Sequence, residues 1–145
     1  MVTNPTKLRR STLYGRDKSI TAWSLAISGL LFVISYLFWR LPGISDSAYD
    51  FLPVDVIGGG FAALLIIATL QAYFNEGLPI SWLLVFLPAF GATVNFVGVG
   101  LQSGDPLTEI GLIIGLPVVI ALVLGTAGFF VGRSTRFIIS SAGAR

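Results

Sequence analysis

The chain of 145 residues contains no cysteine and no histidine. Thiol nucleophiles, disulfides, iron–sulfur clusters and ordinary zinc sites are therefore excluded, because they depend on thiolate sulfur or imidazole nitrogen. Carboxylates alone could still hold Mg²⁺ or Ca²⁺. Nothing in the predicted order of segments brings two acids together, however. We therefore expect no metal site, no cofactor and no enzymatic activity.

Charged residues are also scarce, at 11% of the chain, whereas 54% of the residues are hydrophobic. Soluble domains carry about a quarter charged residues, so this chain lacks the polar surface that water requires. None of the seven acids falls inside a predicted membrane span. Proton-coupled transport depends on ionisable side chains within the membrane. The composition therefore favours an integral membrane protein that does not couple transport to protons.

Four long apolar segments follow a basic N-terminal tail. Each has about 20 residues, which is the length that a helix needs to cross a ~30 Å hydrocarbon layer. The predicted fold class is an all-α membrane protein, with four transmembrane helices in a left-handed antiparallel bundle. The predicted ranges are a tail at 1–19, a membrane domain at 20–132 with spans at about 20–39, 56–74, 79–101 and 110–132, and a C-terminal tail at 133–145.

Positive charge is concentrated at the two ends of the chain. Residues 1–19 hold five of the nine Lys and Arg residues, residues 133–145 hold three, and Arg40 is the remaining one. Cytoplasmic loops carry the excess of Lys and Arg in membrane proteins. We therefore predict a multi-pass plasma-membrane protein with both termini in the cytoplasm. Because topology accounts for these charges, no nucleic-acid partner is expected.

Glycine is abundant in the fourth predicted span. At about 100° per residue, its five glycines fall within an arc of about 140°, opposite large aliphatic residues. Such a face lets another helix approach closely. Gly128 lies to one side of this line, which leaves room for a second contact with another subunit or a second copy. The predicted helix-packing glycines are Gly111, Gly115, Gly125, Gly128 and Gly132 in the fourth span, with Gly91 and Gly98 in the third.

Asn95 is the most informative polar residue, because it lies among small residues within the third span. A buried amide there needs a hydrogen-bond partner, worth about 0.6–2 kcal/mol in a membrane. We expect Asn95 to bond Ser35 or a backbone carbonyl and to fix the helix register. The alternative is a polar passage with Gln102 at its mouth. The possible polar seam comprises Asn95, Gln102, Ser28 and Ser35.

Two further polar features concern the interior of the spans. Gln71 lies near the end of the second span, and we expect its side chain to reach the membrane interface. Pro117 removes a helical hydrogen bond from the fourth span and leaves the carbonyl of Ile113 without a partner. Neighbouring helices must then satisfy that carbonyl. A static bend is the expected result, and a hinge or pore lining is the alternative.

These patterns favour a non-enzymatic polytopic membrane protein that acts as a structural or accessory subunit of a membrane assembly. The expected partners are membrane lipids together with other membrane subunits or a second copy of the chain. The alternative function is a channel or facilitator for a small uncharged or anionic solute, which would pass along the polar seam that includes Asn95.

Overall fold

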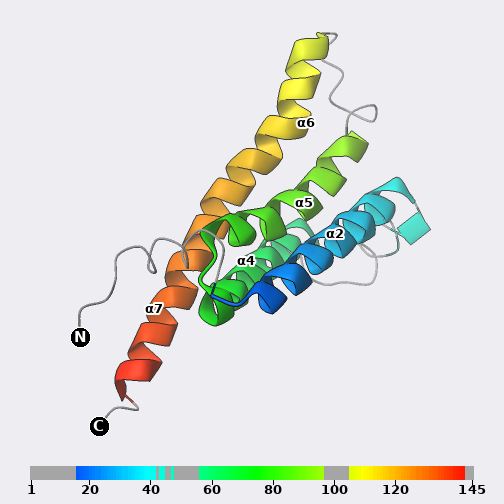
Figure 1. Cartoon of the computed structure of the whole chain (residues 1–145). Helices are drawn as coiled ribbons and strands as arrows, with labels where there is room; N and C mark the ends of the chain where they lie inside the picture. The colour runs from blue at the N-terminus through cyan, green and yellow to red at the C-terminus, as the bar shows by residue number, and fades with distance from the viewer. Residues whose placement is uncertain (1–15, 42, 45–46, 48–55, 97–104, 143–145) are drawn as a thin grey trace.

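The computed structural model describes residues 16–41, 43–44, 47, 56–96 and 105–142 (Figure 1). Four helical segments in this part of the chain are long and apolar enough to cross a membrane. The described residues include no strand. The predicted fold class, an all-α membrane protein with four spans, is confirmed in these terms.

The first three spans are single helices, and the fourth has three parts. The fourth is continuous over 37 residues, or about 55 Å, which exceeds the ~30 Å of a hydrocarbon layer. It continues past Gly132 to Ala142, so most of the predicted C-terminal tail is helical. Residues 97–101 of the predicted third span, with Gly98, lie outside the described residues, as does Gln102. The elements are α2 Lys18–Arg40, α4 Val56–Asn75, α5 Leu78–Phe96, α6 Pro106–Ile120, the π-helical turn η1 Ala121–Gly125 and α7 Thr126–Ala142.

Local side-chain chemistry sets several helix ends. The Asp17 carboxylate accepts the Ser19 N–H at 2.8 Å and caps α2. The Asp105 carboxylate caps α6, and hydrogen bonds from the Thr108 hydroxyl and the Leu107 N–H hold the pKa of Asp105 below its usual value. Carboxylates favour these positions because they satisfy free N–H groups and the positive end of the helix dipole.

The connection between α4 and α5 is very short. Glu76 has a φ of 56°, a left-handed conformation that ends helices. Its N–H still donates to the Ala72 carbonyl at 3.1 Å. The chain therefore reverses within two residues, and α4 and α5 are antiparallel neighbours (Figure 1).

The central helix of the bundle is α5, which contacts α2, α4, α6, η1 and α7. The buried core contains Ala68, Val85 and Ala121. The outward faces of the helices carry large aliphatic and aromatic residues, such as Leu30, Ile66, Val123 and Phe130, all more than half exposed. Lipid is a suitable solvent for such faces, whereas water is not.

The bundle divides into two halves along its length. The terminal half contains the start of α2, the end of α4, the start of α5, and α7. The distal half contains the end of α2, the start of α4, the end of α5, and α6. In Figure 1 the terminal half lies at the bottom of the view, and η1 joins α6 to α7 between the two halves.

Candidate functional site

Three predicted packing glycines lie where α7 and η1 meet other helices. A Cβ added to Gly128 would lie 2.7 Å from the Cβ of Ala68, and one added to Gly132 would collide with the Thr69 carbonyl oxygen. Both contacts are with α4, so Gly128 serves the same contact as Gly132 instead of a second one. The backbone at Gly125 likewise lies close to another helix, because a Cβ there would lie 3.1 Å from the Cα of Trp82 on α5. Helices pack this closely when glycine removes the side chain between them.

Gly91 is the equivalent residue between α5 and α2. A Cβ there would lie 2.7 Å from the carbonyl oxygen of Phe32. The ring of Phe32 also stacks on that of Phe90, with 6.0 Å between centroids. The α2–α5 contact is therefore made by a glycine gap with aromatic rings beside it.

Gly111 and Gly115 are placed differently from the other glycines of the fourth span. A Cβ on either would meet no heavy atom within 4 Å, so neither packs against a helix in the described part of the chain. The cause is η1, because a π-helical turn inserts an extra residue and rotates the following helix by about 100° relative to the preceding one. The single glycine face expected at a constant angle per residue is thus divided into two faces.

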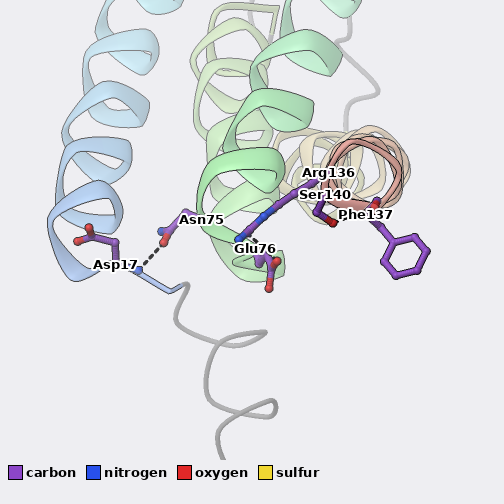
Figure 2. Close-up of polar contacts among 6 residues, drawn as sticks. All are labelled: Asp17, Asn75, Glu76, Arg136, Phe137 and Ser140. Atoms are coloured by element: carbon purple, nitrogen blue, oxygen red, sulfur yellow. Dashed lines mark hydrogen bonds and ion pairs between the residues drawn. The ribbon is translucent and has the colours of Figure 1, made fainter. Parts of the chain in front are cut away.

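The ends of α2 and α4 are joined by the fully buried side chain of Asn75 (Figure 2). Its Oδ1 accepts the Asp17 N–H at 2.7 Å, and its Nδ2 donates to the Thr21 hydroxyl at 2.8 Å. Its backbone carbonyl accepts the Arg16 N–H at 2.8 Å. One asparagine therefore fixes the point at which the chain enters α2.

An ion pair lies next to this cluster and joins α7 to the end of α4. Arg136 donates to the Glu76 carboxylate at 2.7 Å, and both side chains are about a quarter exposed. Figure 2 shows Arg136 reaching from α7 toward Glu76, while Phe137 points away from the bundle. A partly exposed pair of this kind stabilises modestly, by about 0.2–1 kcal/mol, and it orients α7 against α4.

Gln71 does not reach the interface, and that prediction is wrong. Its side chain is 6% exposed, and its Oε1 lies 2.7 Å from the Ser24 hydroxyl. Ser24 also lies 2.8 Å from the Ile20 carbonyl, and one hydroxyl hydrogen cannot serve both acceptors. If the amide is turned over, Nε2 donates to Ser24 and the serine donates to Ile20. Gln71 is therefore a structural link between α2 and α4.

In the predicted polar seam, the side chains of Asn95 and Ser28 form hydrogen bonds to backbone carbonyls. Asn95 donates from Nδ2 to the carbonyls of Tyr36 at 3.1 Å and Gly91 at 2.9 Å. Ser28 is buried and donates to the Leu25 carbonyl of its own helix at 2.9 Å. No hydrogen bond among the described residues links Asn95, Ser28 and Ser35 to one another. The Asn95 amide therefore joins α5 to α2 through a backbone carbonyl.

The carbonyl that Pro117 leaves without a helical partner lies within hydrogen-bond distance of a hydroxyl on α5. The Thr93 hydroxyl lies 3.1 Å from the Ile113 carbonyl and also 3.1 Å from the Phe90 carbonyl of its own helix. On the other side of η1, the Trp82 indole N–H donates to the Thr126 hydroxyl at 3.0 Å. The sequence indicates the need for such a donor through Pro117, but it does not identify Thr93.

An apolar cavity of about 390 Å³ lies in the distal half between α2, α4, α5 and α6. Its polar lining groups are the side chains of Ser35, Thr93 and Trp39, and the remaining walls are aliphatic, aromatic or glycine. Among the described residues, no group of three acids could hold a metal ion. The described part of the chain therefore offers a hydrocarbon-like cavity and exposed helix faces.

The chain was compared with protein-family models, curated proteins and solved structures, and none of them matches it. The class is defined by the fold alone: an all-α membrane protein with four spans, compatible with integral insertion in a bilayer.

Proposed function

We propose that the protein is a non-enzymatic structural or accessory subunit of a membrane assembly. In this proposal it lies in the plasma membrane with both termini in the cytoplasm. The observation that supports the role is a free face of α6, because it carries the geometry of a helix contact but none of the described helices lies against it.

The α6 face comprises residues at helical spacing along one side of α6. Its large side chains are exposed, from 79% at Leu107 to 39% at Val118, and they flank two glycines with open space beside them. The members are Leu107, Ile110, Gly111, Ile114, Gly115 and Val118.

The other end of the fourth span, in α7, provides a direct comparison for this face. Gly128 and Gly132 are four residues apart, and α4 fills the space beside both of them. Gly111 and Gly115 have the same spacing, which is the pattern of close helix association in membranes, and nothing in the described chain fills them. One glycine pair thus builds the fold, and the other is left for a helix of a partner subunit.

The use of the polar side chains supports a structural role over transport. Asn95 and Thr93 are bonded to backbone carbonyls of α2 and α6. The described acids lie at helix ends and connections, at Asp17, Glu76 and the region of Asp105 and Glu109. A solute pathway needs polar groups or charges that face it.

Site-specific crosslinking in native membranes tests the proposal, and the absence of native cysteine simplifies it. A benzophenone reagent is attached at Ile114→Cys on the α6 face, and at Ile66→Cys as a control on the outer side of α4. The native side chains are 48% and 58% exposed, respectively. We expect a discrete protein adduct after illumination at position 114 and none at 66. Adding Gly111→Leu removes the adduct, because the larger side chain fills the space a partner helix requires.

Two results would contradict the proposal. Labelling of lipid alone at both positions would mean that the α6 face has no protein partner. Adducts of equal yield at both positions would mean that collisions are random. The mass of a specific adduct distinguishes a second copy of this chain from another subunit.

A further inference from the structure

The start of α4 stands apart from the other helices of the distal half. Every described side chain from Ile57 to Ala63 is exposed, although α2, α5 and α6 all extend through this half (Figure 1). Gly59 and Gly60 have open space where a side chain would lie. The 390 Å³ cavity fills the gap, with Gly60, Phe61 and Ala63 forming its α4 wall.

The cavity is too small to enclose a helix. A helix with its side chains is about 10–12 Å wide, so a segment 15 Å long takes up roughly 1,200 Å³. The cavity measures about 390 Å³. An engineered cavity of about 150 Å³ takes one benzene, so a cavity of about 390 Å³ has room for roughly 15 carbon atoms, which corresponds to one hydrocarbon chain.

The chemistry of the walls excludes water as the main occupant. A buried water needs two to four polar partners. Three of the lining side chains are polar, Ser35, Trp39 and Thr93. The Thr93 hydroxyl already lies against two carbonyls, and the rest of the wall is aliphatic, aromatic or glycine. Apolar cavities of this kind stay dry or take apolar molecules.

The position of the cavity indicates the source of the chain. On α2 its lining extends from Leu31 to Trp39, near the helix end, a depth of about 12 Å at 1.5 Å per residue. Trp39 lies at the end where tryptophan marks the membrane interface. A chain lying between Trp39 and Leu31 therefore extends from the headgroup level toward the middle of the bilayer.

We propose that this cavity is a binding site for one hydrocarbon chain of a membrane lipid. The chain enters beside the exposed start of α4 and packs against Ala89 and Ala92 on the floor formed by α5. It fills the space between the start of α4 and the other helices of the distal half. The site is independent of the proposed subunit role, because the α6 residues that line it, Leu116 and Ile120, lie outside the α6 face.

A photoreactive lipid tests the site in purified protein. The protein is reconstituted in phosphatidylcholine vesicles that contain a phospholipid with a diazirine in one acyl chain. After illumination, labelled residues are identified by mass spectrometry. We expect a label on Ala89, which is 8% exposed and shielded from bulk lipid. Label confined to exposed residues such as Ile66 and Val123 would overturn the proposal, because it would show only surrounding lipid.

Two neighbouring alanines of α4 provide a matched pair of variants. Ala63 lines the cavity and Ala62 does not, although both are exposed. Ala63→Phe should lower the label on Ala89 by at least about fivefold, since a filled cavity has no room for a chain, whereas Ala62→Phe should leave it unchanged. Equal labelling in the two variants would refute the site. Ala92→Leu fills the same cavity from α5 and repeats the test if Ala63→Phe does not fold.

Discussion

The terminal and distal halves of the bundle contain the same kinds of residue, but these residues make closer helix contacts in the terminal half than in the distal half. In the terminal half, α4 fills the space beside Gly128 and Gly132, and Asn75 forms hydrogen bonds with three groups. In the distal half, Gly111 and Gly115 face open space, and a cavity of about 390 Å³ separates α4 from its neighbours. A glycine pair therefore specifies a close contact only where the helix register turns it toward a partner.

The boundary between the halves lies at Pro117 and η1. The proline frees the Ile113 carbonyl, which lies within hydrogen-bond distance of the Thr93 hydroxyl on α5. The π-helical turn then rotates the helix by about one residue, or about 100°, and brings Gly125 against Trp82. Together they let one long helix pack tightly at one end and present free surface at the other. The proposed subunit contact and the proposed lipid site both lie in the distal half.

The largest expected effect separates the two glycine pairs directly. Gly132→Leu should lower the free energy of unfolding by about 3 kcal/mol, the upper part of the range for overpacking, because backbone atoms of α4 occupy the space. Gly111→Leu should change it by less than about 0.5 kcal/mol, as for an exposed substitution. Unfolding of the purified protein by heat or denaturing detergent measures both. Equal losses would mean that the two halves do not differ in packing.

The spans are predictable from the sequence because they depend on composition and length. Four apolar segments of about 20 residues are sufficient to predict four helices, and Asp17 and Asp105 at helix starts agree with the capping preference. The need for a donor near Ile113 also comes from Pro117 alone. Each of these predictions uses information that lies within one segment of the chain.

The features that the sequence does not predict depend on tertiary contacts. A helical wheel at a constant angle cannot include η1, so it places Gly111 with Gly128 on one face. The sequence shows that Gln71 lies close to a helix end, and this position predicts that its side chain reaches the interface. The sequence does not show that Ser24, on another helix, lies beside it. The sequence likewise does not distinguish Thr93 from the other hydroxyls as the donor to Ile113. Side-chain partners across helices require the register that packing sets.

Substitution of one asparagine in each half should change the free energy of unfolding by a smaller amount and compares the two halves again. Asn75→Ala should cost about 2 kcal/mol, because it leaves the Asp17 N–H and the Thr21 hydroxyl without this buried partner. Asn95→Ala, in the distal half, should cost about 0.6–1.7 kcal/mol, the range for hydrogen bonds between membrane helices. The same unfolding measurement compares them. A greater loss for Asn95 would reverse the order of stability that the structure indicates for the two halves.

The smallest expected effect tests whether Thr93 is the partner of the carbonyl that Pro117 frees. Thr93→Val should cost about 1 kcal/mol, and Thr93→Ser should restore most of the loss because it keeps the hydroxyl. In a Pro117→Ala background the alanine N–H bonds Ile113 within the helix, so Thr93→Val should cost less there. The double-mutant cycle of the two substitutions should therefore give a coupling of at least about 0.5 kcal/mol. Additive losses would separate Thr93 from Pro117, and the junction of the two halves would then depend on packing at η1 alone.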